Sequence, residues 1–227
     1  MSNRKVNLYV NSNRKSISEH SIVLDIDETL VHTFEKISNV KDIGIFTNKK
    51  YLPIRKDIYI IDIFSEDKNT IKYKMWGIYR PKLREFLNFC FRYFRNVTIW
   101  TAGQRRYGNA VVSKIFNNQM PELVFTRDEC PKTMSGGCVN KPLSYIIDKK
   151  NDMSMEHTFI LDDRIDNFDP NPKNGILIPP FEPEEDELLN IEDDAFDKLM
   201  KWFLRKEVIE SKDIRNLNKE NIFSSDL

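Results

Sequence analysis

Residues 22–29 read Ile-Val-Leu-Asp-Ile-Asp-Glu-Thr, an apolar run that ends at two aspartates, Asp25 and Asp27. Continuous aliphatic residues are typical of a strand in a parallel sheet, because helices cover both of its faces. If strand geometry continues to Asp27, the two carboxylates point the same way, with Cα atoms roughly 6 to 7 Å apart. That gap can hold one phosphoryl group. The alternative is that both aspartates only cap the following turn.

The same design, an apolar strand that stops at polar residues, recurs along the chain. It predicts further strands over residues 96–101, 122–127, 157–163 and 175–179. The polar residues at their ends are Thr101, Arg127, Asp162 and Asp163. Ligands of open α/β sheets bind outside the carboxyl ends of the strands, so these side chains are expected to meet Asp25 and Asp27. The predicted fold class is α/β, with a Rossmann-like parallel sheet flanked by helices.

The connections between these strands fit this fold. Parallel strands need crossovers of about a dozen residues or more, which are usually helices. Apolar residues at helical spacing predict helices over residues 81–95, 104–119, 142–149 and 185–205. Within residues 35–79, two β-rich runs at 58–64 and 70–76 instead predict a β-hairpin insertion. The insertion either leans over the site and limits its substrates or is a solvent-facing addition.

Composition agrees with one soluble domain. The chain has 227 residues, 40% of them hydrophobic, which is enough for a sizeable α/β core. Its 35 basic and 35 acidic residues balance, so there is no global attraction to nucleic acid or to a membrane surface. No apolar stretch approaches the roughly 20 residues of a membrane span. We expect a soluble intracellular protein, nuclear or cytoplasmic, with no direct nucleic-acid or membrane partner.

The cysteines and the chain ends lead to two further expectations. Cys90, Cys130 and Cys138 are odd in number and lack metal-ligand spacing, which predicts free thiols in a reducing compartment. Polar composition predicts a mobile segment over residues 1–16 and a polar tail over 208–227 that is mobile from Ser211. Residues 17–207 are then expected to form the domain.

The carboxylates also predict a magnesium site. A phosphomonoester carries two negative charges, so a carboxylate can attack it only if cations neutralise the repulsion. Mg2+ prefers oxygen ligands and keeps several waters. This preference suits Asp25, the main-chain carbonyl of Asp27, and Asp163, with Asp162 nearby. Lys141 is the second candidate cation, although most lysines are solvated surface residues. No cluster of histidine and cysteine favours zinc.

Four short motifs resemble those of the haloacid dehalogenase superfamily. They are residues 25–32 (Asp-Ile-Asp-Glu-Thr-Leu-Val-His), 100–102 (Trp-Thr-Ala), 141–143 (Lys-Pro-Leu) and 161–164 (Leu-Asp-Asp-Arg). Together with the Arg-Pro segment at 80–87, they are most similar to the FCP/SCP-type phosphatases that act on the C-terminal domain of RNA polymerase II. The resemblance covers roughly residues 18–205. The fourth motif is closest to members with a ubiquitin-like domain, but we expect neither that domain nor a BRCT module here. Substrate targeting would then rest on the catalytic unit or a partner protein.

The resemblance implies a role for each candidate residue. Asp25 would be the nucleophile that forms an aspartyl-phosphate, and Asp27 the general acid and base. Thr101 and Lys141 would bind the phosphoryl group. The implied substrate-binding residues are Thr29, Tyr107 and Arg127. For these three the alternatives are loop orientation, helix packing and a structural ion pair, respectively.

We therefore predict a Mg2+-dependent protein serine/threonine phosphatase whose leading substrate is the repeat sequence of the polymerase C-terminal domain. Two other functions stay open. One is a catalytically idle phosphoprotein-binding module. The other is a small-molecule phosphatase of the same superfamily, which usually needs a larger cap than an insertion of about 45 residues to enclose its substrate.

Overall fold

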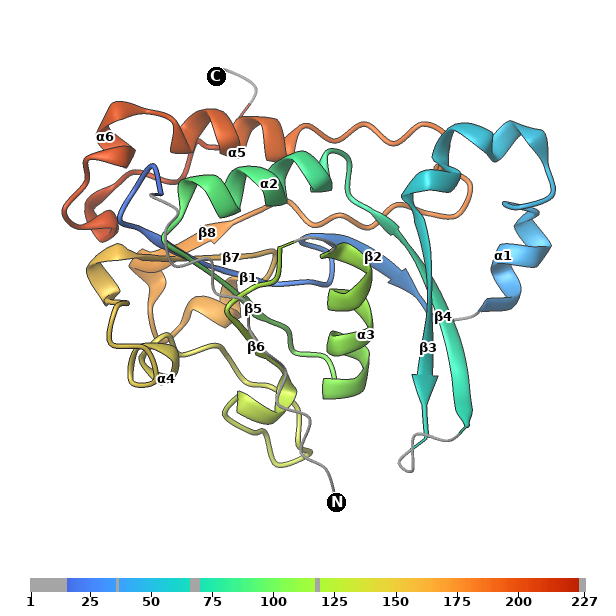
Figure 1. The fold of residues 1–227 in the computed structure, drawn as a ribbon, viewed down its shortest axis with the longest axis horizontal. Helices are drawn as coiled ribbons and strands as arrows, with labels where there is room; N and C mark the ends of the chain where they lie inside the picture. Colours follow the sequence, from blue (N-terminus) through green and yellow to red (C-terminus); the bar gives the residue numbers. More distant parts are fainter. Residues whose placement is uncertain (1–15, 36, 66–69, 117–118, 225–227) are drawn as a thin grey trace.

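The computed structural model describes residues 16–35, 37–65, 70–116 and 119–224. They form a five-stranded sheet in the order β6-β5-β1-β7-β8 and a three-stranded sheet in the order β2-β4-β3 (Figure 1). The five-stranded sheet comprises β1 (Ser21–Leu24), β5 (Asn96–Trp100), β6 (Leu123–Phe125), β7 (Thr158–Asp162) and β8 (Gly175–Leu177). All its neighbouring strands are parallel, which confirms the predicted α/β class.

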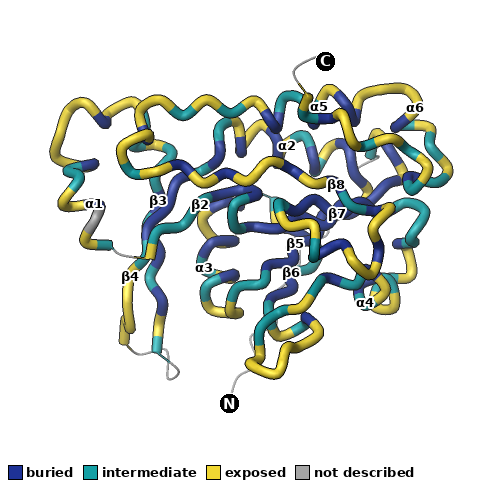
Figure 2. Tube along the Cα trace, turned by 180° about the vertical axis from the view of Figure 1, so that it is seen from behind, coloured by how far each residue is buried: buried dark blue, intermediate teal, exposed yellow. Residues whose placement is uncertain are grey.

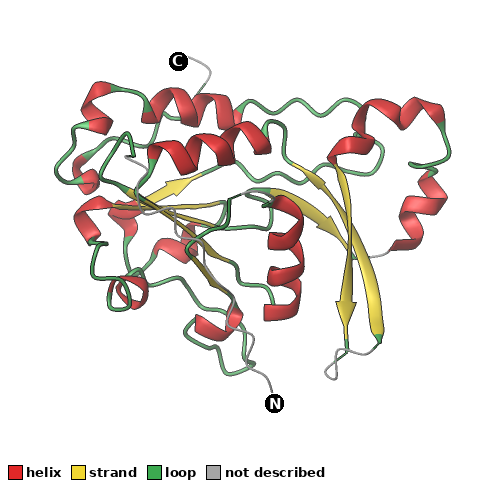
Figure 3. Cartoon of the chain, in the orientation of Figure 1, coloured by secondary structure: helices red, strands yellow, loops and turns green. Residues whose placement is uncertain are grey.

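Helices cover both faces of the five-stranded sheet (Figure 3). They are α2 (Leu83–Tyr93), α3 (Arg105–Ile115) and α5 (Ala195–Phe203) on one face and the short α4 (Ser144–Ile147) on the other. In β1, Ile22 and Leu24 pack toward the first group and Val23 toward the second, so the strand has no exposed face. This two-sided burial is the reason for its continuous apolar sequence. None of the described helices is long and apolar enough to cross a membrane.

The packing of α2 shows how the sequence pattern produces the core. Five residues at helical spacing are buried on one side of α2: Leu83, Phe86, Leu87, Cys90 and Tyr93. The ring of Phe86 stacks on Phe196 of α5, with centroids 4.2 Å apart. Burying a phenylalanine side chain contributes roughly 1.5 to 3 kcal/mol. The predicted helix over 81–95 is thus confirmed, with two residues fewer at each end.

The insertion forms a sheet of its own at one end of the molecule (Figure 1). It contains β2 (Val31–Phe34), β3 (Ile58–Phe64) and β4 (Ile71–Tyr79), and between β2 and β3 lie α1 (Ile37–Ile43) and a 3-10 helix (Lys49–Asp57). The predicted hairpin corresponds to β3 and β4, whereas the two helical segments were not expected. Trp76 and Ile78 pack with Phe181 and Leu188 from beyond β8, which ties the insertion to the main body. The outer end of β4 is exposed (Figure 2).

The helix predicted over residues 185–205 is wrong in its first half. The helical segment α5 begins only at Ala195. Leu188 is buried against the insertion, and the Asp193 carboxylate accepts hydrogen bonds from the guanidinium of Arg80, with the shortest at 2.7 Å, and from the Ala195 N–H at 3.2 Å. These contacts accompany turns over residues 185–190 and irregular chain over 191–194, although their composition also suits a helix.

Two other expectations are corrected at the cysteines and at the C-terminal end. Cys130 and Cys138 form a disulfide in the loop after β6, because a turn brings their Cα atoms within 5.2 Å; Cys90 alone is a free, buried thiol. The tail expected to be mobile from Ser211 is packed up to residue 224, with Ile214 and Ile222 buried in the main core. The predicted mobile N-terminal segment lies outside the described residues, except for Ser16.

Candidate active site

The carboxyl end of β1 places Asp25 in a buried ionic cluster with Lys141 and Asp162. Asp25 directly follows β1, and its N–H still donates to the Leu161 carbonyl of β7 at 3.0 Å. The Lys141 ammonium donates to both carboxylates, to Asp162 at 2.6 Å and to Asp25 at closer range. All three side chains are at least 93% buried. The lysine predicted from the third motif therefore does meet the predicted nucleophile.

The electrostatics of this cluster follow from burial and opposite charge. Burial raises the pKa of Asp25, and the Lys141 ammonium opposes that rise. Burial alone would lower the pKa of Lys141, but the Asp25 and Asp162 carboxylates outweigh it and raise that pKa. Lys141 is therefore held in its charged form between the two acids.

A third carboxylate completes a group that fits a divalent cation. Asp25, Asp162 and Asp163 each offer an oxygen, and these oxygens lie within 4.8 Å of one another. Burial and the Asp162 charge raise the pKa of Asp163 to about 6. Lys141 pairs directly with two of these three acids, Asp25 and Asp162. An all-oxygen set with excess negative charge fits Mg2+.

The metal-ligand candidates are themselves oriented by hydrogen bonds. The Thr29 hydroxyl donates to Asp163 at 3.2 Å. Asp162 accepts from the Asn167 side chain at 2.8 Å and from the main-chain N–H of Arg164 at 3.0 Å. Such outer contacts fix the direction of ligand oxygens. Thr29 is fully buried, so in this structure it orients Asp163.

Asp27 lies beside hydroxyl groups, apart from the carboxylate group described above. One of its oxygens accepts from the Thr101 hydroxyl at 3.1 Å, and the other accepts from the Tyr107 hydroxyl. Burial raises the pKa of Asp27, although the hydrogen bonds from Tyr107 and Thr101 act in the opposite direction. A carboxyl group with a raised pKa in this setting can hold and release a proton.

The loop between β5 and α3 brings Tyr107 to this position. The Gly103 N–H donates to the Thr101 hydroxyl oxygen at 2.9 Å, which turns the chain sharply after the strand. A Cβ atom on Gly103 would lie 2.7 Å from Cδ1 of Tyr107, so only glycine allows the ring to lie against the loop.

Arg127 lies farther from the carboxylates. It follows β6, and its guanidinium donates to the Ala102 carbonyl at 2.9 Å, so that it braces the loop after Thr101. The site residues predicted from the sequence thus lie in three places: the carboxylate cluster, the surroundings of Asp27, and the loop that Arg127 contacts. Sequence reasoning missed the contact of Asn167 with Asp162. The short spacing of five residues between them was the signal available for it.

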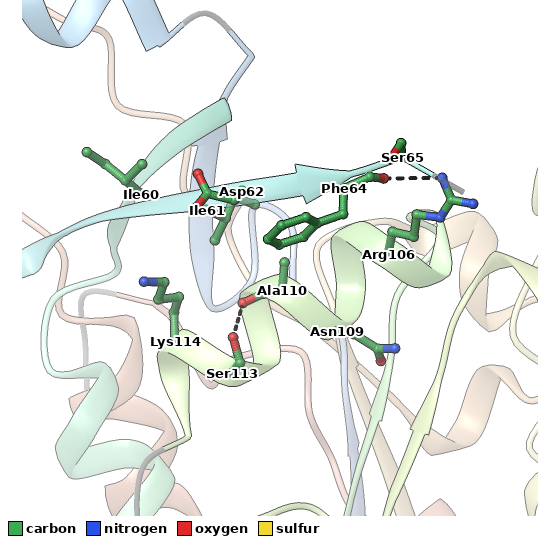
Figure 4. Close-up of a pocket in the computed structure, with 10 residues that line it drawn as sticks. All are labelled: Ile60, Ile61, Asp62, Phe64, Ser65, Arg106, Asn109, Ala110, Ser113 and Lys114. Carbon is green, nitrogen blue, oxygen red and sulfur yellow. Dashed lines mark hydrogen bonds between the residues drawn. The ribbon is translucent and has the colours of Figure 1, made fainter. Parts of the chain in front are cut away.

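A groove lies between the insertion and α3 (Figure 4). It has a volume of about 580 Å3. Its apolar walls include Ile61, Phe64 and Ala110, and Arg106 and Lys114 flank it on α3. The groove is thus formed in part by α3, the helix that also carries Tyr107.

Comparisons with known proteins identify the family and the fold of this chain. The family model of the NLI interacting factor-like phosphatases matches residues 20–215. No curated protein matches the chain significantly. Among solved structures, Fcp1, described as an essential RNA polymerase II CTD phosphatase, is similar with a TM-score of 0.58 and 21% identity, covering 81% of this chain and 46% of that one. Fission yeast Fcp1 bound to beryllium fluoride matches with a TM-score of 0.57, 21% identity and coverage of 81% and 49%.

These structural matches show the fold, and this chain spans about half the length of either Fcp1 chain. The family model covers most of the chain, including β1, the insertion and the carboxylate cluster. It confirms the resemblance to FCP/SCP-type phosphatases of the haloacid dehalogenase superfamily. From the motifs, the sheet and the family match together, the chain belongs to the NLI interacting factor-like phosphatase family.

Proposed function

We propose that this chain is a phosphoprotein phosphatase that hydrolyses phosphoserine or phosphothreonine through an aspartyl-phosphate on Asp25. The supporting observation is the different surroundings of two aspartates that lie two residues apart. Asp25 touches the Lys141 ammonium, whereas Asp27 touches the hydroxyls of Thr101 and Tyr107. An anionic nucleophile and a proton-carrying carboxyl need such unlike environments.

The proposed reaction has two steps. In the first, a carboxylate oxygen of Asp25 forms a bond to phosphorus while the bond to the serine oxygen breaks, and Asp27 gives its proton to that oxygen. In the second, Asp27 takes a proton from water as the water oxygen attacks phosphorus, which releases phosphate and restores Asp25. Lys141 neutralises charge on the phosphoryl oxygens. The Thr101 hydroxyl, which donates to Asp27 in this structure, turns to donate to one of these oxygens when substrate binds.

We propose that Mg2+ is held by side-chain oxygens of Asp25 and Asp163 and by the main-chain carbonyl of Asp27, with Asp162 beside them. When bound, the ion supplies the positive charge that allows an anionic carboxylate to approach a dianionic phosphate. Thr29 and Asn167 keep the carboxylates in place for it.

The groove beside the insertion supports the proposal of a polypeptide substrate. The groove is open, and Arg106 and Lys114 on α3 suit an acidic, phosphorylated chain. We propose that the substrate residues flanking the phosphoserine lie in this groove. We also propose that Arg127, in the loop after β6, contacts the substrate polypeptide. Since a solved relative is described as a polymerase CTD phosphatase, we take those repeats as the leading substrate. We propose an intracellular location, nuclear or cytoplasmic, in which the protein can meet the polymerase.

The first experiment measures phosphate release from polymerase C-terminal-domain peptides phosphorylated at single serines, with Mg2+ or with EDTA. Wild type is compared with Asp25→Asn, and Asp169→Asn is a matched control at an exposed aspartate. We expect release that needs both the metal and Asp25, and no change in the control. Hydrolysis of a small aryl phosphate without any peptide turnover would reject the substrate. Inactivity on both would favour a binding module.

A further inference from the structure

Three residues of the insertion sheet lie side by side across its strands. Thr33 of β2 is opposite Gly77 of β4, and Gly77 is opposite Tyr59 of β3. The Tyr59 hydroxyl nevertheless reaches the Thr33 hydroxyl, with 2.5 Å between the two oxygens. The tyrosine side chain therefore passes over the central strand to the far strand.

Gly77 provides the space for this crossing. A Cβ atom at that position would lie 2.3 Å from the Tyr59 hydroxyl oxygen and 2.4 Å from its Cζ atom. Any other residue would collide with the ring, and both atoms belong to a buried side chain. A glycine inside a strand usually weakens the strand, so its presence here indicates that close approach is needed.

The contact continues from the insertion to Asp27. The Thr33 hydroxyl oxygen is 2.6 Å from the Tyr107 hydroxyl oxygen, and the Tyr107 hydroxyl donates to Asp27. Each hydroxyl has one proton to donate. Since the Tyr107 proton goes to the carboxylate, its oxygen accepts from Thr33, and the Thr33 oxygen accepts from Tyr59. The donors therefore run in one direction, from Tyr59 through Thr33 and Tyr107 to Asp27.

We propose that this chain of hydroxyls positions Asp27 for proton transfer, so that Tyr59 and Thr33 of the insertion are positioning residues for the catalytic step. The inference rests on the proposed function, because it assumes that Asp27 moves a proton. Thr101 holds the other Asp27 oxygen from the main sheet. The carboxyl group is thus fixed between the two sheets, and the insertion serves the chemistry as well as the choice of substrate.

The test uses two small esters that differ in how much they need a proton on the leaving oxygen. Phenyl phosphate releases a basic phenolate and needs the proton, whereas p-nitrophenyl phosphate releases a stable anion and needs it much less. Neither ester has a peptide chain, so peptide affinity cannot change the result. The measured quantity is the ratio of kcat/KM for phenyl phosphate to kcat/KM for p-nitrophenyl phosphate.

We expect Tyr59→Phe and Thr33→Val each to lower this ratio by about three- to tenfold, the effect of one net hydrogen bond. Thr33→Ser keeps the hydroxyl and should keep the ratio. Tyr79→Phe is the matched control. Tyr79 stacks on Tyr59 with ring centroids 5.1 Å apart, but its hydroxyl donates to the Lys114 carbonyl, outside the chain of hydroxyls.

A double variant tests the order of the contacts. Because Tyr59 acts through Thr33, Tyr59→Phe combined with Thr33→Val should lower the ratio no further than Thr33→Val alone. Equal losses on both esters, an unchanged ratio, or additive losses would overturn the inference. Thermal unfolding of each variant confirms that it is folded. Wild-type inactivity on both esters would instead reject the proposed function, so the two failures are distinguishable.

Discussion

Asp25 and Asp27 are two residues apart, yet they share no hydrogen-bond partner among the described residues. The partner of Asp25 comes from 116 residues away, and the partners of Asp27 come from the end of β5 and from the first turn of α3. Three segments distant in sequence thus give two identical side chains different chemistry. At this scale the site depends on the order of the parallel strands, since that order decides which strand ends meet.

Replacing Lys141 with methionine should destabilise the protein most when no metal is present. The substitution leaves Asp25 and Asp162 buried without their ammonium partner. Removing one member of a buried ion pair typically costs about 3 to 5 kcal/mol. Urea unfolding in EDTA should show a loss of that size, and Mg2+ should reduce it.

The matched control for this change is Lys150→Met. Lys150 pairs with Glu122 where both side chains are partly exposed, so its loss should cost less than about 1 kcal/mol. If Mg2+ leaves the stability of the Lys141 variant unchanged, the carboxylates do not form the proposed metal site.

His20 should make the protein less stable in mild acid. Its Nε2 donates to the Val208 carbonyl at 2.8 Å, and its Nδ1 faces that of His157 at 3.2 Å. Burial lowers the pKa of His20 below 6.5, so the unfolded chain takes up this proton more readily than the folded protein. The stability contributed by neutral His20 is present above pH 6.5 and is lost as the pH falls below it.

Two measurements check this prediction. The chain has only three histidines, so NMR titration of their ring protons can resolve His20 directly. Urea unfolding between pH 7 and 5 should show a steeper loss of stability for wild type than for His20→Gln. A His20 titration midpoint at or above that of an unfolded histidine would contradict the prediction.

The elements differ in how readily the sequence reveals them. The buried strands and α2 have strong patterns, since they place apolar residues on both faces of a sheet or along one side of a helix. The 3-10 helix Lys49–Asp57 has a weak pattern because only Tyr51 in it is buried. The start of α5 was misplaced because a tertiary contact, the Asp193 carboxylate with Arg80, overrides local helix preference.

The candidate site, like the fold, was predictable from the sequence only in part. Asp25 and Asp27 stand at a strand end, where the open-sheet rule indicates a ligand. The contacts of Tyr59, Thr33 and Tyr107 depend on the register of the insertion sheet, and no spacing in the sequence encodes that register. The disulfide was missed for a related reason, since its formation depends on how the loop turns.

Filling the groove between β3 and α3 should impair peptide substrates selectively. Asn109 lines the groove and is exposed, so Asn109→Trp adds bulk there without disturbing the core. We expect a higher KM for the phosphopeptide and unchanged kinetics for p-nitrophenyl phosphate. Asn88→Trp, on the exposed side of α2, is the matched control. Equal effects of both variants on the peptide would mean that the groove does not receive it.

At the scale of the whole molecule, the C-terminal segment completes the main core. Val208, Ile214 and Ile222 are buried in the same cluster as β1 and α2. His20, just before β1, contacts Val208, and the Arg215 guanidinium donates to Glu156, just before β7, at 2.9 Å. The segment after α5 is therefore part of the domain.

The contribution of this segment can be measured with one truncation of a side chain. Ile222→Ala should lower the free energy of unfolding by about 2 to 5 kcal/mol, the usual cost of removing a buried isoleucine side chain. Ile165→Ala, at a side chain that is 69% exposed, should change it by less than about 0.5 kcal/mol. Equal urea midpoints for the two variants would show that the segment is dispensable.

The position of β1 in the centre of the sheet also determines when this strand can complete its pairing during translation. This strand is among the first described residues to leave the ribosome, but its neighbour β7 begins at Thr158, and the core still lacks Ile222 at that point. β1 can pair with β5 once residues 96–100 are made, but its other edge stays unpaired until residues 158–162 follow. Pairings between such distant segments form slowly and leave apolar surface open to aggregation. Yield in the cell should accordingly depend on chaperones that shield residues 21–24 until β7 and Ile222 are made.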